Sequence, residues 1–364
     1  MTTSTAPPER HSHAPATVDD ELLAVDTLMR TAALGAPDGI GDGTGDGTGE
    51  GTAILGAIAV DALAVPGKRL RARLALESCA ALATHDVDAR PWAAAVEMVH
   101  NASLVHDDLQ DGDRIRRGRP STWAVYGAAQ AINAGDLMLT VPYRLIGRCE
   151  VSGEVRWHLV DALARAIEEM TRGQADEPSL RTRTSHDAWL ACARMKTGAL
   201  LAVPVEGAAL LAGRSPSEAQ SLARPFARAG ELFQMVDDVI DAFGDKGRDR
   251  RGCDLDEGKV SSLVVAHLAR HPKDAPWLMR VLDAPRGQTS PRDIDETIAS
   301  FDERGALDDV LGNVTALADE VRSAPLLAAE PGLARIASAL IERVLAPLEA
   351  SPRTRLSWGE RRVS

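Results

Sequence analysis

The stretch HNASLVHDDLQDGDRIRRGR, residues 100–119, decides how the rest of the chain is interpreted. Three of its aspartates, Asp107, Asp108 and Asp111, lie close together and are followed within eight residues by four arginines. In a helix, residues four apart share a face, so Asp107 and Asp111 point to one place. Acids this close repel one another unless a multivalent cation lies between them, and Mg²⁺ prefers carboxylate and phosphate oxygens. Guanidinium groups bind phosphate through paired hydrogen bonds, so the stretch predicts a diphosphate site.

The residues before these aspartates indicate where the acidic group lies. An acid-rich helix end followed by a basic turn also occurs on solvated surfaces. However, residues 93–105 are largely apolar, as in a helix buried on most sides. We therefore expect the acidic end of this helix to open into a cavity.

Composition favours an all-α protein. The 364 residues are rich in Ala, Leu, Arg, Glu and Asp, and only 3% are aromatic. No segment alternates convincingly as a strand does, and the breaks predict roughly a dozen helices. The net charge of −12 argues against a nucleic-acid partner and against general attraction to anionic membranes.

Cysteine usage and hydropathy favour a cytoplasmic protein that is not integral to a membrane. The cysteines are widely spaced without a CxxC pair, and no secretory signal is recognisable, so reduced thiols are expected. The four are Cys79, Cys149, Cys192 and Cys253. The most apolar segment, residues 197–213, is shorter than a bilayer span and predicts a buried core helix.

The chain is expected to form one domain with two flexible segments. Residues 1–17, rich in Pro, Ser, Thr and His, predict a disordered tail. Residues 19–34 have acids at their start and helical apolar spacing, which predicts the first helix. Residues 36–52 form a Gly-rich flexible insert, and residues 18–364 as a whole a single all-α domain.

A second acidic group repeats the first. Residues 233–241 read FQMVDDVID, and Asp237 and Asp241 again share a helix face. Two such groups could face each other across a central cavity and hold metal ions, with a diphosphate as the shared ligand. This arrangement would stabilise diphosphate leaving a carbon skeleton, and an apolar pocket would protect the resulting carbocation from water.

The order of short motifs along the chain resembles that of the trans-isoprenyl (polyprenyl) diphosphate synthases, most of all geranylgeranyl diphosphate synthases. The motifs are Gly67-Lys68-Arg69, His100, the first DDxxD at residues 107–111, Arg116-Arg117-Gly118, Gly135-Asp136, Gly173-Gln174, Lys196-Thr197, Phe233-Gln234, the second DDxxD at residues 237–241, Asp254-Leu255 and Gly258-Lys259. The resemblance implies an isoprenoid synthase-type helical bundle around a central cavity, usually as a homodimer. It also implies a prenyltransferase that condenses isopentenyl diphosphate with an allylic diphosphate.

The resemblance further implies a role for each matching residue. The diphosphate of isopentenyl diphosphate would be bound by Lys68, Arg69, His100 and Arg117. Three Mg²⁺ ions would be held by Asp107, Asp111 and Asp237, with Asp241 as a further ligand and support from Asp108. The allylic diphosphate would be neutralised by Arg116, Lys196 and Lys259, with Thr197 and Gln234 near the carbocation. The expected catalytic residues are Asp107, Asp108, Asp111, Arg116, Lys196 and Asp237.

The chain departs from the family pattern in three places. Arg71-Ala72 stands where most members have a proline, the loop after the second acidic motif is short, and no threonine follows Lys259. These changes concern loop closure and rate more than the type of reaction.

Product length would depend on the residues one and two turns before Asp107. These are expected to be Ala102 and Ser103, then Met98 and Val99, none of which is aromatic. Small side chains favour a C20 product, geranylgeranyl diphosphate, and leave C15 and C25 products as alternatives. An Ala102→Phe variant is expected to shorten the product.

Two other functions fit parts of the pattern. A class I terpene cyclase shares the fold, but it stabilises cations with aromatic faces, and this chain has only four Phe and two Tyr. A non-catalytic partner of another prenyl synthase would not need two intact acidic motifs. The prenyl synthase is therefore the favoured interpretation.

Overall fold

The structure is a computed structural model that describes residues 17–35, 50–64, 67–84, 87–182, 184–244, 251–350 and 354. The expected disordered tail up to residue 16 lies outside these ranges. Most of the expected flexible insert, the loop at residues 245–250 and the basic C-terminal residues also lie outside them. Thr17, the last residue assigned to the tail, is the N-cap of the first helix and accepts a hydrogen bond from the Asp20 amide.

The all-α prediction is confirmed. The described residues form the helices α1 Val18–Ala33, α2 Glu50–Leu63, α3 Leu70–Ala81, α4 Arg90–Gln110, α5 Thr122–Tyr126, α6 Ala128–Gly147, α7 Gly153–Asp176, α8 His186–Ala193, α9 Ala199–Leu211, α10 Pro216–Phe243, α11 Cys253–Asp256, α12 Ser262–Arg270, α13 Ala275–Leu282, α14 Pro291–Glu303, α15 Ala306–Arg322, α16 Pro325–Ala328 and α17 Pro331–Ala350. Shorter turns are η1 Glu177–Arg181, η2 Arg194–Gly198 and η3 Pro272–Asp274.

Helix number and one helix start differ from the sequence-based prediction. The described ranges contain seventeen α-helices rather than a dozen, because single-turn helices such as α5, α11 and α16 interrupt the longer segments. The first helix lies where it was expected. Helix α2 begins at Glu50, so the last residues of the segment assigned to the flexible insert are helical.

A small hairpin comes after the first acidic motif, where no strand was expected. Strands β1 Ile115–Arg116 and β2 Arg119–Pro120 pair in antiparallel register. Between them, Arg117 and Gly118 have φ of 51° and 76°, as a two-residue hairpin turn of mirror-image type requires. The hairpin fixes the directions of the Arg116 and Arg117 side chains.

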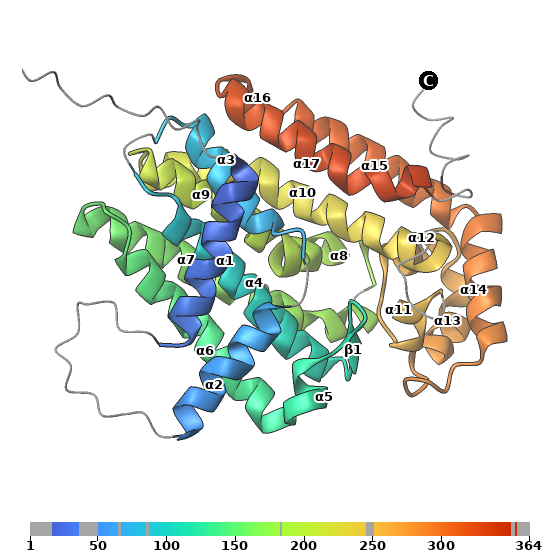
Figure 1. Ribbon diagram of the computed structural model, residues 1–364. Helices are drawn as coiled ribbons and strands as arrows, with labels where there is room; N and C mark the ends of the chain where they lie inside the picture. The colour runs from blue at the N-terminus through green and yellow to red at the C-terminus, as the bar shows by residue number, and fades with distance from the viewer. Residues whose placement is uncertain are drawn as a thin grey trace, which may run out of the picture.

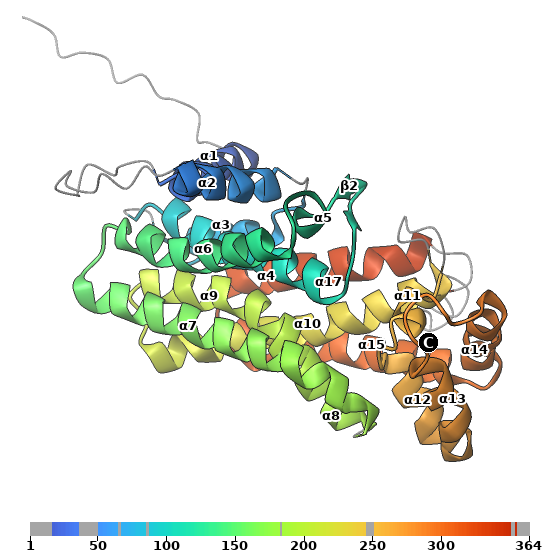
Figure 2. The same cartoon turned by 90° about the horizontal axis from the view of Figure 1, so that it is seen from below.

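Helix α4 lies at the centre of the bundle (Figure 1). It packs against α6, α3, α1 and α9, and most of its residues up to Ala102 are buried. The indole of Trp92 near its start donates a hydrogen bond to the Pro204 carbonyl of α9 at 3.1 Å. In the turned view, α1 and α2 form an outer layer over α3, α4 and α6, and α7, α9 and α10 lie beyond (Figure 2).

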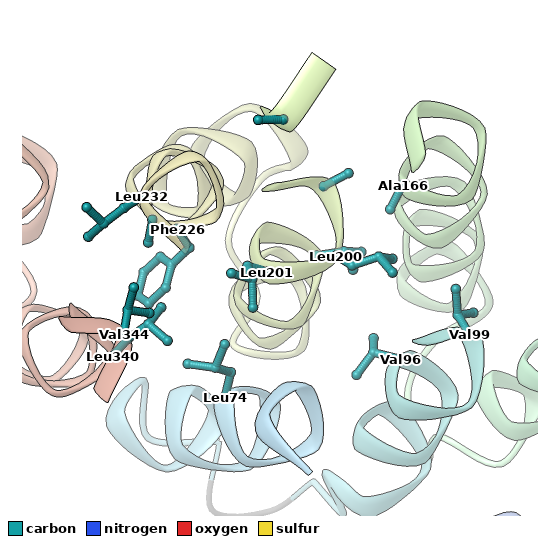
Figure 3. Packing of buried hydrophobic residues seen from close by; sticks show 14 of the residues in the cluster. Leu74, Val96, Val99, Ala166, Leu200, Leu201, Phe226, Leu232, Leu340 and Val344 are labelled. Carbon is teal, nitrogen blue, oxygen red and sulfur yellow. The ribbon is translucent and has the colours of Figure 1, made fainter. Parts of the chain in front are cut away.

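Helix α9 is buried along its length, as expected for the most apolar segment. Its Leu200 lies between α4 and α7, and Leu201 points toward Leu74 of α3 (Figure 3). On the far side of the core, Phe226 of α10 packs toward Leu340 of α17 (Figure 3). The long helices α4, α9 and α10 are therefore held rigidly, and each of them carries site residues.

Burial limits the reactivity of two of the cysteines. Burial raises the pKa of Cys79 and Cys149 to about 12, so both are inert thiols. Within the described ranges, every helix is too short or too polar to span a membrane.

Candidate active site

A large cavity of about 1260 Å³ lies between α4, α6, α7, α9 and α10. The residue 67–71 stretch, the β-hairpin and the turn at residues 257–260 also line it. The expectation that the acidic end of α4 opens into a cavity is therefore confirmed. Both acidic motifs contribute side chains to this one space.

The first motif presents two of its three carboxylates. Asp107 and Asp111 line the cavity, whereas Asp108 is buried on another face of α4. Asp108 accepts a hydrogen bond from Nε of Arg116 at 2.5 Å and forms an ion pair with its Nη2 at 2.5 Å. Burial raises the pKa of Asp108 to about 6, although Arg116 opposes the shift. The structure therefore pairs Asp108 and Arg116 with each other and does not aim Asp108 into the cavity with its neighbours.

Charges of both signs surround the cavity-facing acids. Burial raises the pKa of Asp107; Lys196 opposes this shift and repulsion from Asp111 adds to it. Lys259 lies 2.9 Å from Asp111 and 2.9 Å from Glu257. Burial alone would lower the pKa of Lys259, but these two carboxylates outweigh it and raise the pKa. Lys259 is thus a fixed positive charge beside the first motif.

The second motif presents a single carboxylate to the large cavity and another, that of Asp238, to an adjoining pocket that Lys196 and Lys259 also line. Asp237 lines the cavity. Asp238 is buried and accepts hydrogen bonds from the Ser262 amide at 2.6 Å and from the Gln234 side chain at 3.1 Å. Burial raises the pKa of Asp238 to about 7.

Asp241 departs from its expected place. It is buried, does not line the cavity, and accepts a hydrogen bond from the Asp254 amide at 3.0 Å. The expectation that Asp241 faces the metal site with Asp237 therefore needs correction. The reason is that the chain beyond residue 250 folds back onto the end of α10 and occupies this carboxylate.

A π-helical turn carries Lys196 and Thr197 into the cavity. This turn, η2, interrupts the helical path between α8 and α9, and π-turns are frequent at functional sites. Lys196 lies 2.7 Å from Glu177, and the Thr197 hydroxyl donates to Gln234 at 3.3 Å. Both residues and Gln234 line the cavity as expected.

Close packing fixes the position of this turn. A Cβ atom on Gly230 of α10 would lie 2.4 Å from the Gly198 Cα atom, so the two backbones touch. The fully buried Glu231 forms ion pairs with Arg194 of the turn and Arg228 of α10. Side chains larger than glycine at position 230 would displace the turn and, with it, Lys196.

Basic side chains gather at the end of the cavity near α3. We call this cluster the anion pocket; it consists of Lys68, Arg71, His100 and Arg117, all of which line the cavity. Burial lowers the pKa of His100 well below its ordinary value, and Arg71 and Arg117 lower it further. His100 is therefore a neutral hydrogen-bonding group among guanidinium charges.

Arg69 borders the same cavity but is engaged by the protein. Its Nε lies 2.8 Å from Asp26, its Nη2 donates to the Leu63 carbonyl at 2.8 Å, and its Nη1 donates to Asn101 at 3.3 Å. That Arg69 binds substrate stays a prediction: Arg69 lines the cavity, and each of its three guanidinium nitrogens faces a protein oxygen.

Arg71 is a site residue that the sequence analysis missed. Its Nε is buried and has no hydrogen-bond partner within the described residues. Burial lowers the pKa of Arg71 to about 10, which still leaves it charged. The signal was present, because Lys68, Arg69, Arg71 and Arg73 form one basic stretch that could be either a solvated face or an anion site, but the family resemblance gave roles to Lys68 and Arg69 alone.

Three acids and an arginine at the mouth of the cavity also escaped notice. Glu177 holds Lys196, and Glu257 holds Lys259. Arg286 pairs with Glu257 at 2.9 Å and with Asp113. These residues lie far apart in the sequence, and no local pattern connects them.

The apolar part of the cavity differs from the predicted floor. Ser103 and Leu104 of α4 line it with Leu139, Met170 and Leu200. Ala102, Met98 and Val99 are fully buried elsewhere and do not line it. The prediction for Ser103 is confirmed. Helix geometry explains Ala102 and Met98, because residues five and nine before Asp107 lie on the opposite face of α4, whereas Leu104 and Ser103, three and four before it, share its face.

The donor set suits Mg²⁺ that is completed by substrate. Three hard carboxylates, those of Asp107, Asp111 and Asp237, enter one cavity. In the part of the chain that the structure describes, no three His, Cys, Asp or Glu side chains converge closely enough to hold a metal by themselves. Mg²⁺ is usually held by one or two carboxylates together with waters and phosphate oxygens, so these residues fit it.

Comparison with known proteins identifies relatives of this chain. A family model described as polyprenyl synthetase matches residues 52–300. A (2E,6E)-farnesyl diphosphate synthase of Mycobacterium tuberculosis strain H37Rv is 39% identical over 183 residues, 49% of this chain and 50% of that protein. The chain thus spans about half the length of this relative.

Two other similar proteins extend the match. A geranylgeranyl diphosphate synthase of the same organism is 33% identical over 275 residues, 72% of this chain and 78% of that protein. The crystal structure of a polyprenyl synthetase from Streptomyces coelicolor A3(2) superposes with a TM-score of 0.74 at 25% identity. That superposition covers 90% of this chain and 98% of the other.

Proposed function

The chain belongs to the polyprenyl synthetase family, and from this premise we propose that it is an Mg²⁺-dependent prenyltransferase. It would condense isopentenyl diphosphate head to tail with an allylic diphosphate and release a trans-polyprenyl diphosphate. The observation that carries the proposal is one cavity lined by both acidic motifs and by a separate cluster of basic residues. This division fits two diphosphates, one bound through Mg²⁺ and the other bound by basic side chains alone.

The allylic diphosphate would bind between the two acidic motifs. Asp107, Asp111 and Asp237 would hold the Mg²⁺ ions, which supply charge stabilisation to the leaving diphosphate. Lys196 and Lys259 line the same region and are held by Glu177, Glu257 and Asp111. When a diphosphate binds, these ammonium groups can exchange their carboxylate partners for phosphate oxygens with only a small change in position.

The second diphosphate, that of isopentenyl diphosphate, would occupy the anion pocket. Arg71 offers a buried donor within the described residues, and its charge matches a phosphate edge. His100 would add a neutral hydrogen bond, because burial and the surrounding guanidinium groups lower its pKa and keep it unprotonated. This pocket would bind diphosphate without metal, so it would discriminate the nucleophile from the allylic substrate.

The reaction would begin when the C–O bond of the allylic diphosphate breaks and diphosphate departs with the electron pair. The double bond of isopentenyl diphosphate then attacks C1 of the allylic cation, and the new tertiary cation loses a proton, which we assign to the departing diphosphate. Thr197 and Gln234 lie at the cavity wall beside Asp237, where they can orient the reacting carbon. The surrounding apolar wall excludes water from the cation.

We further infer a C20 product, geranylgeranyl diphosphate, with C15 as the second candidate. The face of α4 that carries Asp107 continues into Ser103, a small side chain, and no aromatic residue stands there. Leu139 and Met170 border the cavity from the opposite helices and set its depth. The similar proteins include both a farnesyl and a geranylgeranyl diphosphate synthase, which is why product length needs a measurement.

We also propose that residues 18–364 act as one domain, that the protein is cytoplasmic, and that it works as a homodimer. Exposed apolar side chains on α5 and α6, among them Val125, Ile132 and Tyr143, support self-association. Analytical ultracentrifugation at several concentrations tests the dimer. A species of 38.7 kDa at every concentration would contradict it.

Product analysis tests the proposed function. The purified chain is incubated with Mg²⁺, isopentenyl diphosphate and dimethylallyl, geranyl or farnesyl diphosphate in turn, and the products are resolved by mass. A C20 diphosphate is expected from each primer. Hydrocarbon formed from an allylic diphosphate alone would identify a cyclase instead. Absence of turnover with every primer would favour a non-catalytic partner.

A further inference from the structure

Helix α1 contacts Arg69, which lies beside the anion pocket, although the helix precedes the matched family region. That region begins at residue 52, whereas α1 ends at Ala33. Asp26 of α1 lies 2.8 Å from Nε of Arg69, which borders the cavity. The side chains of Arg69 and Asp26 are 11% and 30% exposed, so this ion pair is shielded from much of the solvent.

The backbone at Arg69 adopts a conformation that must be held in place. Arg69 has φ 45° and ψ 41°, in the left-handed region that residues with a side chain rarely adopt. It is also the N-cap position of α3, and its own side chain makes no capping hydrogen bond. Such a conformation persists only where the surroundings fix it.

Four protein groups fix Arg69 from three helices. The carboxylate of Asp26 comes from α1 and the carbonyl of Leu63 from the end of α2. The amide oxygen of Asn101 and, at 3.8 Å, the carboxylate of Glu97 come from α4. Asp26 is the one charged partner within 3 Å among these described contacts. Its Oδ1 makes no hydrogen bond within the described residues, so Asp26 acts on Arg69 through charge, whereas Leu63 and Asn101 act through hydrogen bonds.

Two residues of the anion pocket, Lys68 and Arg71, lie on either side of Arg69 in the sequence. Lys68 precedes it, and Arg71 lies in the first turn of α3 just after it. The left-handed residue between them sets the angle at which the chain enters α3. The buried Glu97 strengthens this geometry, because it accepts a hydrogen bond from the Ala72 amide at 3.1 Å. If Arg69 relaxed, Lys68 and Arg71 would diverge.

We infer that Asp26 is a positioning residue for the isopentenyl diphosphate pocket, acting through Arg69 on Lys68 and Arg71. This inference rests on the proposed function. Helix α1 is then a working part of the substrate site and not only an outer layer of the bundle. Loss of Asp26 is expected to weaken binding of isopentenyl diphosphate and to leave the metal-bound allylic diphosphate unaffected.

The chain supplies a matched control on the same helices. Asp19 of α1 pairs with Arg73 of α3 at 2.5 Å, but the Asp19 side chain is 81% exposed and neither residue lines the cavity. Asp19→Ala removes an ion pair between the same two elements without touching Arg69. Asp26→Asn keeps an oxygen near Arg69 and serves as the conservative variant.

The test measures direct binding by calorimetry with isopentenyl diphosphate alone, which does not depend on turnover. Asp26→Ala is expected to raise its Kd roughly three- to tenfold, the range for one partly exposed charge contact. Asp26→Asn should fall between this variant and wild type, and Asp19→Ala should match wild type. In steady-state assays, KM for isopentenyl diphosphate should rise while kcat and KM for the allylic diphosphate stay within about twofold of wild type.

Several outcomes overturn the inference. One is an Asp26→Ala Kd equal to that of Asp19→Ala, and another is equal weakening of both substrates, which would indicate a general structural role. If Asp26→Ala does not fold, Asp26→Asn is judged by the same comparison. A wild-type chain that binds isopentenyl diphosphate but forms no product contradicts the proposed function alone. One that fails to bind it contradicts both.

Discussion

The two acidic motifs have the same spacing but present different numbers of carboxylates. The first gives the cavity Asp107 and Asp111, whereas the second gives it Asp237. In the second motif Asp241, the counterpart of Asp111, is buried under the Asp254 amide. A shared helix face therefore does not by itself bring both carboxylates into the cavity.

The difference arises from the path of the chain after each motif. Asp111 is the C-cap of α4, and the chain then leaves into the hairpin, so its carboxylate stays open to Lys259. Asp241 lies within the last turn of α10, and the returning chain donates the Gly252 amide to its carbonyl at 2.9 Å. The middle aspartates behave alike, because both are buried and both have a raised pKa.

The largest expected effect on kcat distinguishes Asp237 from Asp241, the first and last aspartates of the second motif. Asp237→Asn should lower kcat by about 10³-fold, because it removes a cavity carboxylate from the leaving-group site. Asp107→Asn should do the same. Asp241→Asn should lower kcat by about tenfold or less, because an amide oxygen can still accept from Asp254. Steady-state rates of all three variants at saturating Mg²⁺ check this, and equal losses would break the comparison.

A smaller effect is expected from the fixed charges near the first motif. Lys259→Gln should reduce kcat/KM for the allylic diphosphate by about 10²-fold, the typical loss for one electrostatic contact to developing charge. Arg286→Gln, which removes a charge at the mouth that pairs with Asp113 and Glu257, should cost about tenfold at most. Similar losses in both variants would mean that the overall field, and not contact at Lys259, matters.

The length of the product tests which residues of α4 face the cavity together with the first motif. Ser103→Phe should shift the main product from C20 to C15, because the ring would enter the cavity one turn below Asp107. Ala102→Phe should leave product length unchanged and lower stability by about 1–3 kcal/mol through overpacking. Mass-resolved products and urea unfolding distinguish them. A shortened product only in Ala102→Phe would restore the floor that was predicted from the sequence.

The smallest expected effect is a pH dependence of the free energy of unfolding, which arises from His100 of the anion pocket. The pKa of His100 lies well below 6.5, so the folded state binds fewer protons than the unfolded state below that pH. Stability is unaffected by His100 above pH 6.5 and falls as pH drops, by at most about 1.4 kcal/mol per unit. His100→Gln removes this slope. Urea unfolding at about pH 7.5 and 5.5, on either side of the ordinary histidine pKa, measures it. Parallel slopes in both proteins would show that His100 is protonated in the folded state.

Much of the fold and part of the site could be predicted from the sequence. Apolar periodicity located the buried α9, and four-residue spacing placed Asp107 and Asp111 together. Tertiary contacts decided the remainder. No local pattern indicates that Arg69 would be held by Asp26, that Asp241 would be covered by Asp254, or that Arg71 would keep an unpartnered nitrogen among the described residues. The sequence-based prediction placed Ala102 wrongly at the cavity floor. With a rotation of roughly 100° per residue, a residue five before Asp107 lies on another face of the helix.

The most direct test of unequal metal binding is a crystal structure with Mn²⁺ in place of Mg²⁺ and an unreactive allylic diphosphate analogue. Anomalous scattering locates each Mn²⁺ ion and its ligands. We predict metal bonds from Asp107, Asp111 and Asp237, while Asp241 keeps its hydrogen bond to the Asp254 amide. Metal bonds from Asp241, with that hydrogen bond broken, would contradict the claim that the two motifs contribute unequally.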